Sequence, residues 1–450
     1  MNALLSSAPL LLLRRRGALA DVLPIIAFAA ATAIIATVLG GAAAFFGRSA
    51  ADPVAMTGES SIMPFLSFCA FIASALLVPS AVGLGGSAAR LSLARREQDL
   101  ATMRLVGGTS GQVGSVAVLD VVAQSLLGAV IGIGAHAAVT PALTRLDFGI
   151  TPFSAADLLM PLWAYSVLVL ALVVLAAGSA GVSLMGVVLS PLGVARDSRV
   201  VRLSVMRLVI WGVLIIGFVL FMNVGAAIMG QSGGGAMAIV IVVLFVAAIV
   251  AGINVVGPFI VWVSALVLAK TAPFPSLMVG ARRLAGDPRA GWRAVSGITF
   301  ALVVAGFLTV SATLGEASNP EEAMMFTAMN TGGLLTLGIA AVLAAVSTGV
   351  TQTARVIDQA PRLRAQHIAG AEVAQLHRAR LAEIAVPVLL SSIIATGTAL
   401  LVITTVLGGT PNNPMMALQY LGSVVGAYVL VVAAVLVASP LVNRYATRAA

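Results

Sequence analysis

Ten apolar stretches divide this chain, and each has enough residues to cross a membrane as a helix. About 30 Å of hydrocarbon requires about 20 helical residues at 1.5 Å per residue. Only 9% of the residues are charged, whereas a soluble domain carries roughly 25%. The pattern predicts an all-α integral membrane protein. The expected crossings are 20–46, 62–84, 113–139, 159–185, 208–228, 237–268, 295–314, 332–350, 384–407 and 417–442.

The basic residues give these crossings a direction. When the crossings are threaded in order, all but two of the 25 Lys and Arg residues fall on one side, and only Arg48 and Arg145 fall on the other. By the positive-inside rule the basic side is cytoplasmic, which places both termini in the cytoplasm. Topology and anionic lipid headgroups therefore explain the net charge of +9 better than nucleic acid does, and no nucleic-acid partner is expected.

The two halves of the chain repeat one plan. ARREQDLATMRLVGG at 94–108 aligns with VIDQAPRLRAQHIAG at 356–370, and each segment lies between the second and third crossings of its half. Asp120 and Glu383 open the two third crossings at nearly the same spacing. A repeat of this kind, in one orientation, predicts a pseudo-twofold axis along the membrane normal. The expected domains are a first four-helix half at 1–200, a two-helix connector at 201–270 and a second four-helix half at 271–450.

The segment 88–108 predicts a cytoplasmic helix that is fused to the second crossing. Its apolar residues recur at helical spacing, and Arg95 and Asp99 form an i,i+4 pair on another face. Gly107–Gly108 is expected to end this helix just before the third crossing. A helix joined rigidly to a membrane helix can transmit a push.

The residues of this segment resemble a known family. RREQDLATMRLVGGTSGQV is similar to the signature of FtsX-like permeases, in which an Arg-Glu pair precedes an Arg-x-x-Gly and an acidic residue in the next helix. Arg96 and Glu97 match the pair, and Arg104 and Gly107 match the second element. Asp120 takes the place of a glutamate.

The resemblance implies a MacB-type permease subunit of an ABC transporter, a class that works by mechanotransmission. The ten-helix layout resembles the BceB branch without its large extracellular domain. Such a subunit lies in the bacterial plasma membrane among its lipids, works with a cytoplasmic ABC ATPase, here in two copies, and exports an amphiphilic substrate. A drug, an antimicrobial peptide, as in antimicrobial resistance, or a lipid-like molecule fits that description.

The resemblance also implies where the ATPase docks. One docking helix is the segment 88–108, and the other lies at 352–378, where Gln366 stands in the place of Arg104. The expected ATPase-coupling residues are Arg95, Arg96, Glu97, Arg104, Gly107, Gly108, Arg355, Asp358, Arg362, Arg364 and Gly370. Asp21, Asp120 and Glu383 are expected as interfacial charges paired with arginines, in preference to a proton relay.

No catalytic, cofactor or metal site is expected in this chain. A phosphate-binding loop needs GxxxxGK[ST], and the only lysine, Lys270, has no such glycines around it. ATP and Mg are therefore expected in the partner ATPase. His136 reads more readily as a packing residue than as a ligand. Met324 and the methionines near it could bind a soft metal or haem, but methionines more often line apolar surfaces.

Two alternatives to the exporter remain open. One is a relay without transport, similar to FtsX itself, that controls an extracytoplasmic partner such as a cell-wall hydrolase. The other is an ion- or proton-coupled transporter, which the lack of charge at the middle of the crossings disfavours.

Overall fold

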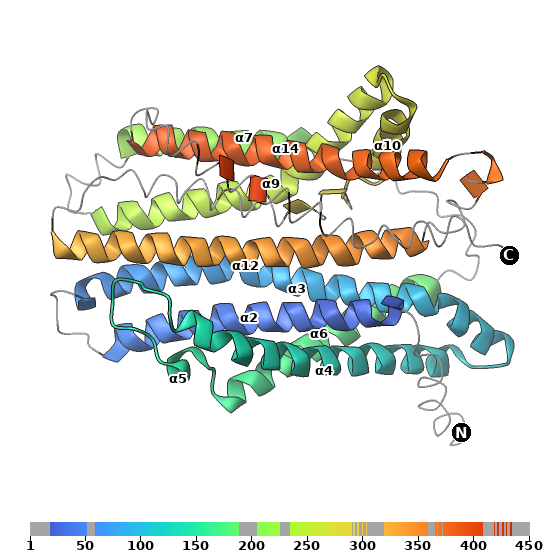
Figure 1. Ribbon diagram of the computed structural model, residues 1–450, viewed down its shortest axis with the longest axis horizontal. Helices are drawn as coiled ribbons and strands as arrows, with labels where there is room; N and C mark the ends of the chain where they lie inside the picture. Colours follow the sequence, from blue (N-terminus) through green and yellow to red (C-terminus); the bar gives the residue numbers. More distant parts are fainter. Residues whose placement is uncertain are drawn as a thin grey trace. The chain divides into compact units, whose positions relative to one another are not determined.

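In the part of the chain that it describes, the computed structural model consists of helices joined by turns and loops, without a strand (Figure 1). The described residues are 19–51, 59–188, 205–225, 235–289, 319–358 and 372–407, with short pieces within 291–303, 365–370 and 418–433. The main helices are α2 (Leu19–Ala51), α3 (Glu59–Leu105), α4 (Ser110–Leu143), α5 (Ala155–Leu158), α6 (Leu162–Val188), α7 (Val205–Leu220) with the π-helical turn η1 (Phe221–Gly225), α9 (Gly235–Thr271), α10 (Pro275–Gly286), α12 (Pro320–Asp358) and α14 (Val373–Leu407).

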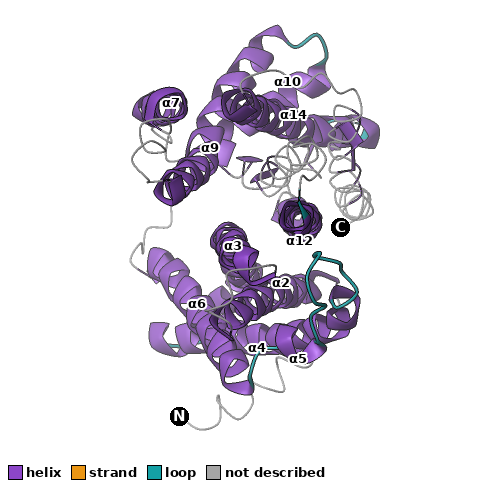
Figure 2. Ribbon diagram, turned by 90° about the vertical axis from the view of Figure 1, so that its left-hand side faces the viewer, coloured by secondary structure: helices purple, strands orange, loops and turns teal. Residues whose placement is uncertain are grey.

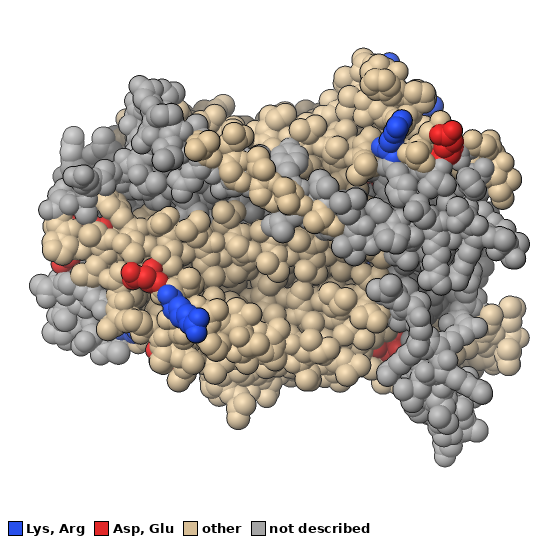
Figure 3. Space-filling model, in the orientation of Figure 1, with Lys and Arg blue, Asp and Glu red and all other residues tan. Residues whose placement is uncertain are grey.

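Eight helices in the described part are long and apolar enough to cross a membrane, and each coincides with one of the ten expected crossings. Most of the residues of the other two expected crossings, 295–314 and 417–442, lie outside the described part. On the face shown in Figure 3, the described charged side chains lie toward the ends of the helices. The prediction of an all-α, multi-pass membrane protein is therefore confirmed, and the number of ten crossings stays a prediction.

The first compact unit comprises Met1–Leu146 and Thr151–Asp197. In it α2 packs against α3 and α4, and α6 packs against α3 and α4 (Figure 2). Gly132 makes the α2–α4 approach possible, because a Cβ there would lie 2.6 Å from Thr32 Cβ. Small residues that let backbones approach closely are typical of helix packing in membranes.

The second compact unit comprises Asp147–Ile150 and Ser198–Ala450, and it includes the helices expected as a connector. Its α9 packs against α7, α10 and α14. The indole N–H of Trp211 on α7 donates to the Ile249 carbonyl of α9 over 3.0 Å, and the ring lies against Gly252. Trp292, which is buried, lies against Gly257 in the same way. Two glycines of α9 thus accommodate two large aromatic side chains.

Candidate coupling turns

The predicted coupling helix is the end of α3 itself. This helix runs without a break over 47 residues, from Glu59 to Leu105, which is about 70 Å at 1.5 Å per residue. The part suited to a membrane ends at Leu93, so the helix continues beyond the bilayer. A continuous helix transmits displacement along its axis through its backbone hydrogen bonds, although Pro64 and Pro79 each remove one of these bonds within α3.

Glycine ends α3 in the way that the sequence predicts. Gly107 adopts a φ of +101°, the left-handed region that favours glycine. The N–H of Gly108 donates to the Met103 carbonyl over 3.0 Å, which is the six-residue bond of a Schellman motif. This closure satisfies a carbonyl that a helix end otherwise leaves without a partner.

The start of α4 is capped just as tightly. Thr109 is its N-cap residue, and the Thr109 hydroxyl accepts a hydrogen bond from the N–H of Gln112 over 3.3 Å. In return the N–H of Thr109 donates to Gln112 Oε1 over 3.1 Å, which completes a capping box. With both helix ends capped, the turn between α3 and α4 is a short, closed corner.

A similar turn recurs before α14. Gly370 adopts a φ of +97°, and the N–H of Ala369 donates to the Ala365 carbonyl over 3.0 Å. In the first turn the N–H of Val106 donates to the Thr102 carbonyl over 3.1 Å. One offset of 263 residues relates three pairs of positions in the two turns. It separates the two left-handed glycines (107 and 370), the first residues of α4 and α14 (110 and 373), and the two acids that follow (120 and 383).

This recurrence corrects the pairing drawn from the sequence. The sequence alignment pairs Gly108 with Gly370, but the left-handed position is occupied by Gly107 and Gly370. The pairing therefore shifts by one residue, because the position that requires glycine fixes the register of the turn. Arg104 then corresponds to His367 instead of Gln366.

The two acids occupy equivalent buried positions. Asp120 is 7% exposed in α4, and Glu383 is 8% exposed in α14. Gln124 Nε2, one helical turn further along, donates to Asp120 Oδ2 over 2.8 Å. A buried carboxylate requires such donors to offset its lost hydration. The side chain of Asp21 lies outside the described residues, so its pairing stays a prediction.

The amphipathic helix α10 is attached to the second turn. The guanidinium of Arg283 donates to Gln366 Oε1 over 2.8 Å. Three residues earlier, Gly280 packs so closely on α14 that a Cβ would lie 2.6 Å from the Ala379 carbonyl oxygen and 3.2 Å from the N of Glu383. Helix α10 thus contacts the second turn and the start of the helix that follows it.

Most of the predicted coupling side chains are not described. The backbones of Arg95, Arg96, Glu97 and Arg104 belong to α3, and those of Arg355 and Asp358 belong to α12. Arg362 and Arg364 lie outside the described residues. Docking of an ATPase on these residues therefore stays a prediction, whereas the turns that carry them have the geometry given above.

At the opposite end of the helices, Arg48 holds the connection between α4 and α6. Its guanidinium donates to the carbonyl oxygens of Thr151 and Pro152 and lies 3.5 Å from the Asp157 carboxylate. The guanidinium also lies 3.9 Å from the centre of the Phe153 ring, a cation–π distance. The sequence identified Arg48 only as one of two basic residues on this side, without any partner.

His136 lies between α4, which carries it, and α2. It is buried, and its Nδ1 lies 3.0 Å from the hydroxyl oxygen of Thr37 on α2. Among the described residues, no group of three His, Cys, Asp or Glu side chains is placed to hold a metal ion.

The eight long apolar helices in the described part of the chain define a multi-pass membrane protein. Residues 71–188 match the family model described as FtsX-like permease C-terminal. The match includes the extended end of α3, the Gly107 turn, α4 and α6. Over these residues the chain is similar to FtsX-like permeases, which agrees with the sequence signature. The comparisons with curated proteins and with solved structures found no match.

Proposed function

We propose that this chain is the transmembrane permease subunit of an ABC transporter. In this proposal separate cytoplasmic ATPase subunits hydrolyse ATP, with Mg, and the chain converts their movement into export or extraction of an amphiphilic substrate. The observation that carries the proposal is the continuity of α3 from the membrane to the Gly107 turn. The family match over the same residues supports it.

The turn suits a mechanical role. A partner that moves the end of α3 moves α4 as well, because the Schellman bond and the capping box leave few free torsions between the two helices. Displacement at the turn then reaches the other side of the bilayer along both helices. An ATPase surface would pair with the charges at the end of α3, which are those of Arg95, Arg96, Glu97 and Arg104.

The recurrence of the turn before α14 supports two docking sites on one polypeptide. We expect two ATPase copies, two pseudo-symmetric four-helix halves within ten crossings, and both termini in the cytoplasm. The second site differs in chemistry from the first, since Arg283 already binds Gln366. The proposal therefore implies two docking sites that differ in their affinity for the ATPase.

The substrate class follows from the surroundings of the chain. A subunit that moves membrane helices acts most directly on molecules that lie in the bilayer, so a drug, an antimicrobial peptide or a lipid-like molecule is the expected cargo. A relay without transport is the second candidate. The ordered connection held by Arg48 favours it, because that connection could pass movement to an extracytoplasmic partner.

Reconstitution with a candidate cytoplasmic ABC ATPase tests the proposal. ATP hydrolysis in liposomes should rise when the transported amphiphile is added, and the double charge reversal Arg96→Glu with Glu97→Arg should abolish that rise while the permease remains inserted. Arg207→Glu, on exposed α7, is the matched control and should leave hydrolysis unchanged. Stimulation that survives the double reversal would contradict the docking role. Hydrolysis that responds to no amphiphile but to an extracytoplasmic protein would favour the relay.

A further inference from the structure

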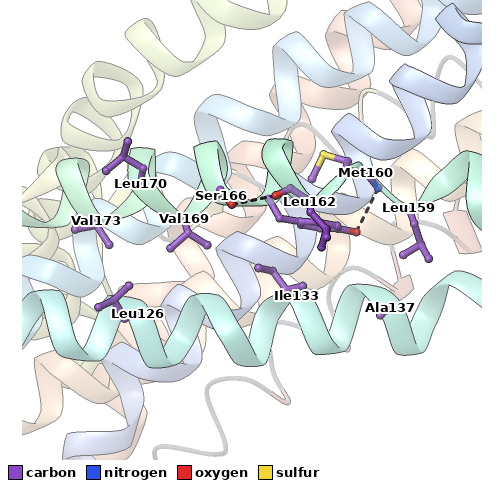
Figure 4. Close-up of a pocket in the computed structure, with 11 residues that line it drawn as sticks. Leu126, Ile133, Ala137, Leu159, Met160, Leu162, Ser166, Val169, Leu170 and Val173 are labelled. Atoms are coloured by element: carbon purple, nitrogen blue, oxygen red, sulfur yellow. Dashed lines mark hydrogen bonds between the residues drawn. The ribbon is translucent and has the colours of Figure 1, made fainter.

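A groove of about 950 Å³ runs between α4 and α6 in the first unit (Figure 4). Leu126, Ile133 and Ala137 line it from α4, and Leu162 and Val173 mark the limits of the lining on α6. Its volume lies within the roughly 300–1,000 Å³ of small-molecule sites. The groove is therefore large enough for a lipid-sized ligand.

The length of the groove identifies the kind of occupant. On each helix the lining residues span eleven steps, from Leu126 to Ala137 and from Leu162 to Val173, which is about 16 Å. A transmembrane helix of a partner would need about 30 Å, whereas one leaflet has about half that depth. The length of the groove therefore matches an acyl chain of a single leaflet, and it is about half of what a transmembrane helix of a partner would span.

The chemistry of the lining agrees with an acyl chain. Leu162 is 85% exposed and Leu170 is 63% exposed, so both present bare hydrocarbon to the bilayer. The two hydroxyl groups of the lining already have partners, because Ser166 donates to the Leu162 carbonyl and the Tyr165 hydroxyl accepts from the N–H of Met160. Each of the two hydroxyls thus already takes part in one hydrogen bond within the chain.

Arg145 provides a charge beyond the groove. It follows the last residue of α4 by two positions and is exposed, eight residues along the chain from Ala137. Within the described residues no acidic side chain forms an ion pair with it, in contrast to Arg48, which binds Asp157. Trp163, at the same end of α6, is largely exposed, as interfacial tryptophans are. A phosphate of a lipid headgroup is the natural partner of such an arginine.

We propose that the α4–α6 groove binds an acyl chain of an anionic phospholipid whose phosphate pairs with Arg145. The lipid would fill the space between the two helices from the side of the α4–α6 connection. This site is independent of the ATPase and of any cargo.

Photolabelling of the full chain tests the site. The protein is placed in vesicles that contain phosphatidylglycerol with a photoreactive acyl chain, and the labelled peptides are mapped by mass spectrometry. Label should concentrate on 126–137 and 162–173 relative to Ile216 on α7, which is also exposed. Label spread evenly over these helices, or absent from the groove because another helix covers it, would overturn the proposal.

Substitutions in the groove and at Arg145 separate the acyl-chain site from the headgroup site. Ala137→Phe should fill the groove and remove most of the label, and Ser166→Phe on the opposite wall should do the same. Ala135→Phe, exposed on α4 outside the lining, is the matched control. Wild-type protein should prefer phosphatidylglycerol to phosphatidylcholine by about fivefold, and Arg145→Gln should reduce that preference to about equal labelling. Loss of label in the Ala135 variant alone, or no preference in the wild type, would contradict the assignment.

Discussion

The guanidinium of Arg283 reaches across 83 residues of sequence to donate a hydrogen bond to Gln366 Oε1 over 2.8 Å. Arg283 belongs to α10, which also packs on α14 through Gly280. The second coupling turn is therefore attached to α10, a helix that belongs neither to the turn nor to α14, the crossing that follows it. If an ATPase moves this turn, either α10 moves with the turn or the hydrogen bond between Arg283 and Gln366 breaks.

The Arg283 bond gives a direct prediction about the second turn. Arg283→Ala should raise the rate of amide hydrogen exchange in 365–373 several-fold, because the turn loses its side-chain tether. Arg282→Ala is the matched control, since Arg282 is the exposed neighbour of the half-buried Arg283. Equal exchange rates in the two variants would show that the bond does not restrain the turn.

Replacing Gly107 tests the first turn. Gly107→Ala forces an alanine into φ +101°, which costs about 1–2 kcal/mol of stability for a left-handed residue. Gly111→Ala lies in α4, where a Cβ meets no neighbouring atom, so it should be neutral or slightly stabilising. Thermal unfolding in detergent, with coupled ATPase activity as the second readout, distinguishes the two. A Gly107 variant as stable as the Gly111 variant would contradict the left-handed geometry.

Much of this architecture could be predicted from the sequence, and the reasons are physical. Long apolar runs define crossings because hydrocarbon requires them, and a glycine after an amphipathic segment marks a helix end. The register of the repeat could not be predicted, since Gly107 and Gly108 are adjacent and only the backbone shows which one has the positive φ. The Arg283–Gln366 bond and the Arg48 contacts join residues that are far apart along the chain, and a single sequence carries no signal for such pairs.

The close approach of α2 and α4 predicts unequal effects for two glycines of one helix. Gly132→Leu places its side chain against Thr32 and the backbone of α2, where a Cβ alone would already meet atoms within 2.6 Å. Overpacking of this kind costs about 1–3 kcal/mol or more. Gly134→Leu, two residues away, points into open space and should leave stability nearly unchanged. Denaturation of both variants in the same detergent compares their losses of stability. Similar losses of stability in the two variants would argue against the α2–α4 contact.

Arg48, in the last turn of α2, and Arg145, just after the end of α4, should respond differently to the same substitution. Arg48→Gln removes the ion pair with Asp157 and two hydrogen bonds to the backbone at Thr151 and Pro152, so the connection loses most of what holds it to α2. Amide exchange in 151–158 should rise several-fold, and protease cleavage should become detectable there. Arg145→Gln should leave both measures unchanged, because among the described residues Arg145 forms no ion pair that the substitution could break.

A connection that stays protected without Arg48 would mean that packing of Phe153 against Phe45, whose ring centres lie 5.0 Å apart, is sufficient to hold it. Arg48→Lys separates these contributions further, since it keeps the charge near Asp157 but lacks the planar fork that reaches two carbonyl oxygens at once, and protection in this variant should fall between that of the wild type and that of Arg48→Gln.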